Sequence, residues 1–257
     1  HYIFYDELNH ESIQENRELE EHFETALENE EFEIWYQPKY SAHSRKLVGA
    51  EALVRWRRAD GALIPPLKFI PLFERNGNII RLDEYVFRAV CRQQKEWQKQ
   101  GQKMLPVSVN ISRVSLYYSS VVEKYESIIR SFDLDSKYIQ LEITESAYVE
   151  EYKVITGVAE ALRNAGFTVL MDDFGSGYSS LNMLKDVNVD VLKIDMKFLK
   201  MDENTMDKGM GILEAVTRMA NIMGLRMIAE GVETEDQINY LLNMGCIYGQ
   251  GYFFYKP

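Results

Sequence analysis

The stretch that decides the fold is Phe167-Thr168-Val169-Leu170-Met171-Asp172-Asp173-Phe174-Gly175-Ser176-Gly177, an apolar run that ends in two neighbouring carboxylates and a glycine-rich turn. A short apolar run of this kind predicts a strand that is buried on both faces, as in a parallel sheet. Adjacent carboxylates repel each other, so either one pKa rises or a cation neutralises both. We therefore expect a buried strand that delivers Asp172 and Asp173 to a candidate metal site.

Seven further strand-like runs alternate with helical patterns along the chain. The eight predicted strands cover residues 32–40, 47–56, 106–111, 138–144, 167–172, 189–195, 225–230 and 247–254. Helical patterns are clear over residues 82–100, 149–165 and 212–223, and Thr234 with Gln237 has capping-box spacing. Eight such units predict an α/β fold, a modified TIM (β/α)8 barrel. Only residues 41–46 separate the first two strands, and a parallel crossover needs a dozen or more residues, so we expect an antiparallel first strand.

The net charge of −11 is confined to the start of the chain. Residues 1–33 contain Asp6 and eleven Glu against the single Arg17, whereas the other 224 residues carry 28 acidic and 28 basic side chains. The sequence contains no tract of basic residues that would indicate a protein that binds duplex nucleic acid. The acidic segment, residues 6–31, has Leu19, Phe23 and Leu27 four apart and predicts an amphipathic helix. This helix is either an ordinary solvated first helix or a connector to an upstream domain.

The sequence lacks two features that would place this part of the protein in or outside a membrane: a long apolar run and a disulfide framework. No apolar run approaches the roughly 18 residues of a membrane span, so we expect no membrane segment here. Cys91 and Cys246 lie far apart, which gives no sign of a disulfide framework and favours a cytoplasmic setting. A longer parent protein with a membrane tether stays compatible with both observations.

Most predicted strands carry a polar residue that a buried strand has no structural reason to keep. These residues are Gln37, Glu51, Asn110, Glu142, Asp172, Lys193 with Asp195, Glu230 and Gln250. The C-terminal ends of barrel strands build the active site, so their repeated position favours one shared pocket. Several of these residues, and the neighbouring Asp173, have a structural alternative: an edge-facing Glu51, a turn-forming Asn110, a surface-paired Glu142, a helix-capping Asp173, or a solvated Glu230 or Lys193.

The residue types in this set predict the metal. No His or Cys belongs to it, and oxygen ligands suit magnesium, manganese or calcium; we expect Mg²⁺ or Mn²⁺. Coordination lowers the pKa of a water, which makes a coordinated water the predicted nucleophile, and Asp172 with Asp173 could serve two ions. Lys193 could stabilise charge or orient that water, and Asp195, two residues on, projects to the same side.

The sequence resembles the EAL domain, the bacterial phosphodiesterase module for the second messenger cyclic di-GMP (c-di-GMP). The signature triplet is Glu51-Ala52-Leu53, between Tyr36-Gln37-Pro38 and Val54-Arg55-Trp56. Further matches, in order, are Val109-Asn110-Ile111-Ser112, Leu141-Glu142-Ile143-Thr144-Glu145-Ser146, Asp172 to Ser180, Leu192-Lys193-Ile194-Asp195, Ala229-Glu230-Gly231-Val232-Glu233 and Gln250-Gly251-Tyr252. The resemblance covers residues 31–257. Residues 1–30 are similar to the connector that often follows a GGDEF or sensor domain.

The resemblance implies a role for each matched residue. It implies one metal bound by Glu51, Asn110, Glu142 and Asp172, and a second bound by Asp172, Asp173 and Glu230. It implies catalytic roles for Glu51, Lys193, Asp195 and Glu230, the lysine and Asp195 orienting the water. Substrate contacts fall on Gln37, Leu53, Arg55, Asp195 and Gln250. Glu145 matches the acid that anchors the loop after Asp173, which in the family links the metal site to dimerisation.

The implied reaction is two-metal hydrolysis of c-di-GMP to linear 5′-pGpG by a homodimer. The sequence departs from the family at Ile247, where an acid is common, and over residues 200–210. Two alternatives stay open. One is a receptor that binds without turnover, against which the complete ligand set counts. The other is a barrel aldolase with Lys193 as a Schiff-base lysine, which strict metal dependence would contradict.

Overall fold

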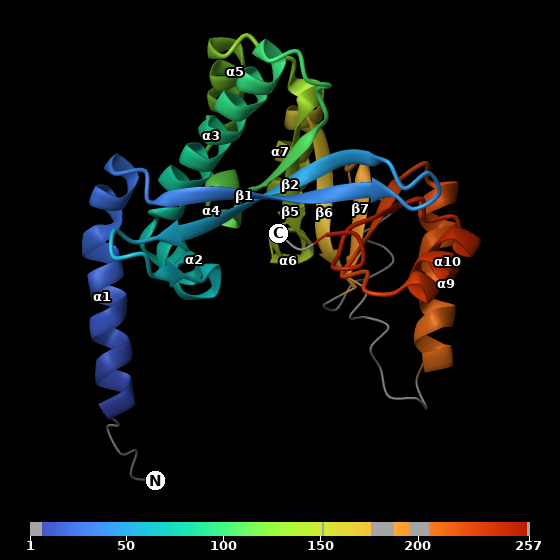
Figure 1. The fold of residues 1–257 in the computed structure, drawn as a ribbon, viewed down its shortest axis with the longest axis horizontal. Coiled ribbons are helices and arrows are strands. Elements are labelled where there is room, and N and C mark those ends of the chain that lie inside the picture. The colour runs from blue at the N-terminus through green and yellow to red at the C-terminus, as the bar shows by residue number, and fades with distance from the viewer. Residues whose placement is uncertain (1–6, 151, 176–187, 196–205, 256–257) are drawn as a thin grey trace.

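The computed structural model describes residues 7–150, 152–175, 188–195 and 206–255 (Figure 1). Eight strands close into a barrel: β1 (Phe32–Ser41), β2 (Leu47–Arg57), β4 (Val107–Asn110), β5 (Ile139–Thr144), β6 (Thr168–Phe174), β7 (Val191–Asp195), β8 (Arg226–Glu230) and β9 (Tyr248–Gly249). The order around the barrel is β1-β9-β8-β7-β6-β5-β4-β2, and β1–β2 pairing closes it. A two-residue strand, β3 (Leu63–Ile64), extends the edge of β2.

The first strand is antiparallel to both of its neighbours. β1 pairs antiparallel with β2 and with β9, whereas every barrel pair from β2 round to β9 is parallel. The fold prediction, a modified (β/α)8 barrel with an antiparallel first strand, is confirmed.

Helices between the strands surround the barrel. They are α1 (Glu7–Glu28), α2 (Pro66–Asn76), α3 (Ile79–Lys99), α4 (Arg113–Leu116), α5 (Val121–Ser131), α6 (Glu145–Glu150), α7 (Tyr152–Asn164), α9 (Met206–Ile222) and α10 (Glu235–Met244), with a 3-10 turn at Ser136–Tyr138. Thr234 caps α10 in the predicted capping box. Among the helices within the described ranges, none combines the length and apolar content of a membrane span.

The last strand is shorter than the sequence predicted. The apolar pattern predicted a strand over residues 247–254, but β9 contains only Tyr248 and Gly249. Beyond β9 the chain packs against Val232, whose backbone N–H donates to Gln250 O at 3.1 Å. Gly251 has a φ of 152°, and an added Cβ there would lie 2.3 Å from backbone atoms of Val232, so this close approach requires glycine. The aromatic residues beyond it, Phe253 and Phe254, pack against the core from outside the barrel wall.

The acidic helix α1 packs against the barrel through an aromatic cluster. Figure 1 shows α1 beside α2 at the opposite end of the molecule from α9 and α10. Phe23 is fully buried, and its ring centroid lies 4.7 Å from that of Phe73 and 6.0 Å from that of Phe32. Cations on α2 and α3 meet the acidic side chains in the ion pairs Lys68–Glu15, Arg81–Glu24 and Arg92–Glu30. The charge of this segment is therefore partly neutralised by the surface on which it lies.

We predict that Phe23→Ala destabilises the whole domain. Removing a fully buried aromatic side chain leaves a cavity and costs about 3–5 kcal/mol of unfolding free energy. Urea denaturation followed by tryptophan fluorescence measures the change, and Ile13→Ala, at an exposed position on the same helix, is the matched control. Equal stability of the two variants would show that α1 is not part of the cooperative core.

Candidate metal centre

The predicted site residues lie together at the mouth of the barrel. In the strand register Gln37 is opposite Glu51, Asn110 is opposite Glu142, and Asp195 is opposite Glu230. Asp172 is opposite Thr144, the last residue of β5. Because these residues occupy matching positions on neighbouring strands, closure of the barrel brings their side chains to one pocket.

Carboxylate oxygens form two overlapping groups with the spacing of metal ligands. One group is Glu51, Glu142 and Asp172, and the other is Asp172, Asp173 and Glu230; within each, one oxygen per residue lies within 4.8 Å of the others. Oxygen atoms that bind one magnesium ion at about 2.0–2.1 Å lie at most about 4.2 Å apart, which is within this separation. Asp172 belongs to both groups. The arrangement can hold two adjacent hard cations with Asp172 between them.

Lys193 lies at the centre of the cluster and is completely buried. Its Nζ is 3.2 Å from Glu51 Oε2, 3.1 Å from Asp172 Oδ1 and 2.7 Å from Glu230 Oε1, and it also contacts Glu142 Oε2. The solvated alternative for Lys193 is therefore wrong. The structure also rules out the surface-paired alternative for Glu142, which is 1% exposed, and the edge-facing alternative for Glu51, which is 5% exposed.

The pKa shifts show that the cluster has too little positive charge. Burial raises the pKa of Glu230 well above its usual value, and Asp172, Glu51 and Glu142 add to the rise against the opposing effect of Lys193. Burial also raises the pKa of Asp172. Burial would raise the pKa of Glu142 as well, but Lys193 and Lys39 outweigh it and lower the value to about 2. One part of the cluster is thus fully compensated and the other still requires a cation or protons.

The chemistry of the donor set supports the fit to a metal. Glu230 Oε1 is buried, and its partner is the ammonium of Lys193 at 2.7 Å, which Glu51, Glu142 and Asp172 also contact. An all-oxygen ligand set without imidazole or thiolate suits Mg²⁺ or Mn²⁺. The residues at this site therefore fit the predicted ions.

The amide side chains at the site bind Glu51. Asn110 Nδ2 donates to Glu51 Oε1 at 2.9 Å. Gln250 Nε2 donates to Glu51 Oε2 at 2.6 Å and to Gln37 Oε1 at 3.1 Å. The turn-forming alternative for Asn110 is not needed, because its side chain faces the cluster. Both oxygens of Glu51 are held in fixed directions.

Two hollows flank the carboxylates and share Leu53. One, of about 350 Å³, contains Gln37, Asp173, Asp195, Glu230 and Gln250 among its lining residues. The other, of about 270 Å³, is more apolar and is lined by Leu53, Arg55, Pro66, Ile70 and Asn110 among others. We refer to these two adjoining hollows together as the cleft. All predicted substrate-contact residues lie along it.

Glu145 makes the contact expected of a loop anchor. It is buried at the start of α6, and its Oε2 accepts a hydrogen bond from the backbone N–H of Gly175 at 2.9 Å. Gly175 directly follows β6, so the carboxylate fixes the point at which the chain leaves Asp173. The anchored loop, residues 176–187, and the divergent residues 200–205 lie outside the described residues.

The sequence reasoning missed two buried charged residues next to the site. Lys39 is 2% exposed, and its Nζ donates to Glu142 Oε1 at 2.8 Å and to Ser108 Oγ at 2.6 Å. Its position two residues after Gln37 on a strand was the available signal, because alternate residues share a face. Asp83 is 7% exposed on the apolar face of α3, where an acidic residue between Leu82 and Val86 could have been noticed.

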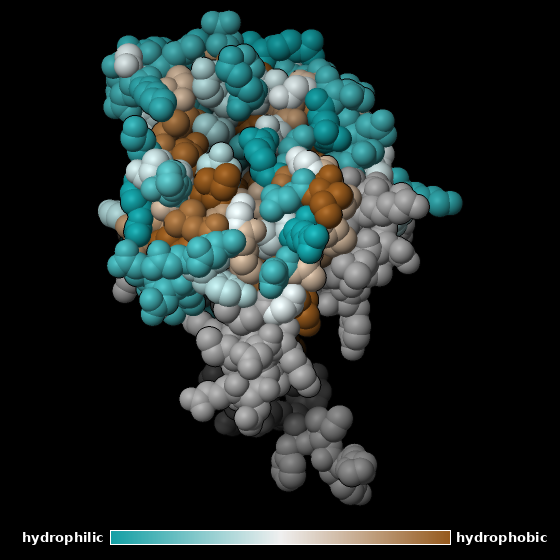
Figure 2. Space-filling view, turned by 90° about the vertical axis from the view of Figure 1, so that its right-hand side faces the viewer, coloured by the Kyte–Doolittle hydropathy of each residue, from teal (hydrophilic) through white to brown (hydrophobic). Residues whose placement is uncertain are grey.

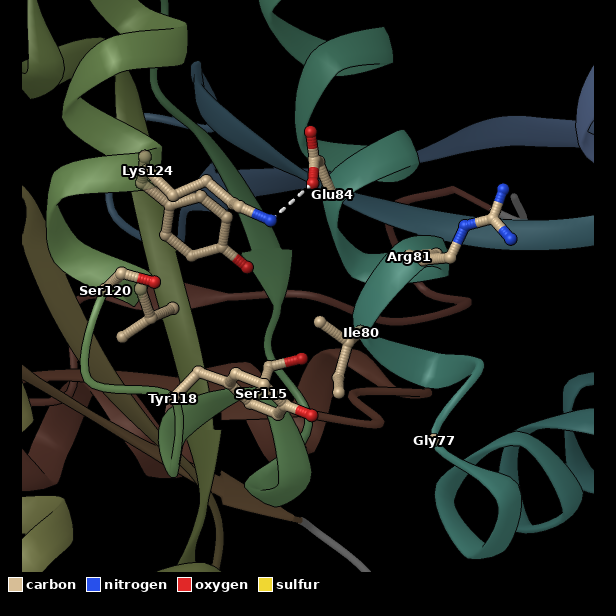
Figure 3. Close-up of a pocket in the computed structure, with 10 residues that line it drawn as sticks. Gly77, Ile80, Arg81, Glu84, Ser115, Tyr118, Ser120 and Lys124 are labelled. Carbon is tan, nitrogen blue, oxygen red and sulfur yellow. Dashed lines mark hydrogen bonds and ion pairs between the residues drawn. The ribbon is translucent and has the colours of Figure 1, made fainter.

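Asp83 fixes the loop that follows Asn110. Its Oδ2 accepts hydrogen bonds from the backbone N–H of Ser112 at 2.9 Å and from Ser115 Oγ at 2.6 Å. Figure 3 shows Ser115 in the wall of a separate pocket of about 300 Å³ between α3 and the α4–α5 segment, where Glu84 and Lys124 pair at 2.8 Å. Asp83 therefore lies between this outer pocket and the apolar hollow of the cleft.

Comparison with known proteins identifies the family. The EAL domain family model matches residues 20–257, and the chain belongs to this family. It is 35% identical over 240 residues to the cyclic di-GMP phosphodiesterase NbdA of Pseudomonas aeruginosa, covering 93% of this chain and 30% of that protein. It is 32% identical to the bifunctional diguanylate cyclase/cyclic di-GMP phosphodiesterase MucR of the same species, covering 100% of this chain and 37% of that protein.

Solved structures agree with this assignment. The PaMucR phosphodiesterase in its c-di-GMP complex superposes with a TM-score of 0.85 at 32% identity, covering 93% of this chain and 97% of that chain. The chain spans about a third of the length of the two curated relatives. The similarity therefore concerns one domain of larger proteins.

We predict that Asp83→Asn stabilises the domain in a pH-dependent way. Burial raises the pKa of Asp83 to about 6, against the hydrogen bonds from Ser115 and Ser112, while Glu74 adds to the rise. This value exceeds the unfolded pKa near 3.9, so the folded state binds more protons between these values and wild-type stability falls as the pH rises from about 4 to 6. Asn does not titrate and can still accept the two hydrogen bonds.

The advantage of the variant should therefore grow from pH 4 to pH 6, reach about 2–3 kcal/mol, and then stay constant. Urea denaturation at one-unit pH steps measures it. The control is Asp133→Asn, whose wild-type side chain is 97% exposed. An Asp83→Asn difference that is the same at every pH would contradict the prediction.

Proposed function

We propose that this domain hydrolyses c-di-GMP to linear 5′-pGpG in a reaction that requires two Mg²⁺ or Mn²⁺ ions. The observation that carries the proposal is the pair of carboxylate groups joined by Asp172 in the barrel mouth. Membership of the EAL family and the named activities of NbdA and MucR support the substrate. Bound ions would lower the pKa of a coordinated water and offset charge on the reacting phosphate.

The residues divide into three roles. Glu51, Asn110, Glu142 and Asp172 would hold one ion, and Asp172, Asp173 and Glu230 the other. Lys193 and Asp195 would orient the attacking water. Arg55 would offset phosphate charge, while Leu53, Gln37 and Gln250 would contact the substrate along the cleft. A dinucleotide is elongated and carries two bases, which suits a cleft made of two adjoining hollows.

The aldolase alternative is disfavoured by the surroundings of Lys193. A Schiff-base lysine must be a neutral nucleophile, which requires a lowered pKa. Burial would lower the pKa of Lys193, but Glu142, Glu230, Glu51 and Asp172 outweigh it and raise the pKa well above its usual value. An ammonium in this cluster stays charged and can bind anions or orient water.

The setting of the domain follows from the same proposal. A messenger nucleotide and two buried free cysteines suit a reducing cytoplasm. The chain covers only part of its relatives, and one of these is named as a cyclase as well as a phosphodiesterase, so we propose an upstream GGDEF or sensor domain in the intact protein.

We predict that Glu51→Gln abolishes hydrolysis. Even residues behind metal ligands cost 10–100-fold on mutation, so loss of a ligand should cost more than about 100-fold. The assay incubates c-di-GMP with purified protein and Mg²⁺ or Mn²⁺ and identifies the product by chromatography and mass spectrometry. Glu33→Gln is the matched control, because Glu33 lies on β1 and pairs with Arg57 at 2.6 Å, away from the cluster.

Wild-type protein that binds c-di-GMP in saturating metal without turnover would support the receptor alternative instead. Turnover that persists in Glu51→Gln, with a normal melting temperature, would exclude the proposed ligand role.

We further propose a homodimer that uses the face of α9. Figure 2 shows hydrophobic side chains gathered among hydrophilic ones on the face where α9 and α10 lie. Ile212, Ile222 and Met223 are exposed there, and exposed apolar patches commonly mark protein interfaces.

Light scattering after size-exclusion chromatography should show a dimer that Ile222→Glu converts to monomer. The control is Ile13→Glu, at an exposed isoleucine on α1; dissociation by the control alone would move the interface to α1.

A further inference from the structure

Lys39 is a buried cation directly below the proposed metal centre, and the proposed chemistry gives it no role. Its Nζ donates to Glu142 Oε1 at 2.8 Å, while the other oxygen of Glu142, Oε2, contacts Lys193. Glu142 is 1% exposed. Each oxygen of this carboxylate therefore contacts a different ammonium group.

The antiparallel direction of β1 places Lys39 on that side. Gln37 is opposite Glu51 in the register and reaches Gln250 in the mouth. Lys39, two residues further along β1, shares the inward face and is opposite Gly49, nearer the start of the parallel strands. It lines a hollow of about 140 Å³ there with Pro106 and Arg226 among others. A parallel first strand would run the other way and would carry the residue after Gln37-Pro38 towards the mouth.

The two lysines that contact Glu142 differ in how many other acids they contact. Lys193 is shared among Glu142, Glu51, Asp172 and Glu230, which are the acids that would bind the ions. A cation that binds to the oxygens of these acids must replace some of their contacts with Lys193. The contacts of Lys39 are Glu142 Oε1 and Ser108 Oγ, which lies behind the cluster on β4, so Lys39 can stay in place.

We propose that Lys39 is a positioning residue that holds Oε1 of Glu142 away from the metal, so that Glu142 binds a divalent ion through Oε2 alone. The inference rests on the proposed metal centre, and it adds that Lys39 fixes the orientation of the Glu142 carboxylate through Oε1. The terminal torsion of a glutamate is broad, so a carboxylate without such a partner turns readily. Lys39 removes this freedom before the ion arrives, and it satisfies the carboxylate oxygen that the ion does not use.

The first test is a crystal structure of the wild-type protein with Mn²⁺. We expect Glu142 Oε2 within about 2.0–2.2 Å of an ion, as for octahedral coordination by hard oxygen ligands, and Oε1 still hydrogen-bonded to Lys39 Nζ. A Glu142 that chelates the ion with both oxygens, or that has left Lys39, would overturn the proposal.

The second test measures Mn²⁺ binding by calorimetry without nucleotide. Lys39→Met keeps the length of the side chain and removes its charge and donors; we expect a 10–100-fold weaker Mn²⁺ affinity, the usual effect of losing a residue that orients a metal ligand. Lys39→Arg should restore most of the affinity, because the hollow below leaves room for the longer side chain. Ser108→Ala, which removes only the other hydrogen bond of Lys39, should have a smaller effect than Lys39→Met.

Several outcomes separate this proposal from others. Lys39→Met that binds Mn²⁺ as well as wild type would show that Lys39 does not position Glu142, and tighter binding would show that Lys39 repels cations. Either result would overturn the inference while leaving the metal centre intact. Wild type that binds no Mn²⁺ would contradict the proposed function itself.

At saturating Mn²⁺, Lys39→Met should lower kcat more than it raises KM for c-di-GMP, since Lys39 does not line either hollow of the cleft. If Lys39→Met does not fold, Lys39→Gln tests the same loss of charge with a donor retained.

Discussion

The structure depends on one buried ammonium group. Lys193 has no exposed surface and contacts carboxylates from four different strands, β2, β5, β6 and β8. A buried ion that loses its partner costs several kcal/mol, so each of these strands is constrained to present its acid at the right height. A register slip of one residue would turn the acid to the outer face of the barrel. The charge cluster therefore specifies the strand register as well as the site, although the apolar core supplies most of the folding free energy.

The antiparallel first strand connects this cluster to the rest of the fold. β1 closes the barrel between β2 and β9, and its residues Gln37 and Lys39 contact Gln250 and Glu142 respectively. At its other end Phe32 packs against Trp56 and Phe23, which attaches the acidic helix α1. Trp56 Nε1 also donates to Glu31 Oε2 at 2.9 Å. A single hairpin thus connects the N-terminal helix to the strand that carries Glu51.

Much of this arrangement could be predicted from the sequence, because strand periodicity and strand-end polarity are local signals. The lengths of the intervals gave the antiparallel first strand, and the polar residue at the end of each apolar run gave the carboxylate cluster. The short β9 could not be predicted, since the residues after Gly249 pack against the backbone of Val232, which is a tertiary contact. Lys39 follows the same alternation as Gln37, but a lysine on a strand is usually solvated. Its burial depends on Glu142, which is 103 residues away in sequence.

The uneven ionisation of the acids indicates where added charge belongs. Glu142 has two lysine partners and a pKa of about 2. Among the described residues, the lysine that contacts Glu230 and Asp172 is Lys193, and both acids have raised pKa values, for which burial is the first cause. Added positive charge therefore stabilises the side of the cluster that contains Asp172 and Glu230, and this side opens into the cleft beside Asp173 and Asp195. A phosphodiester brings negative charge to the same place and would be repelled by the acids alone. Under the proposed function, binding of cations and binding of a phosphate would therefore favour each other at this site, while Lys39 stays paired with the other oxygen of Glu142.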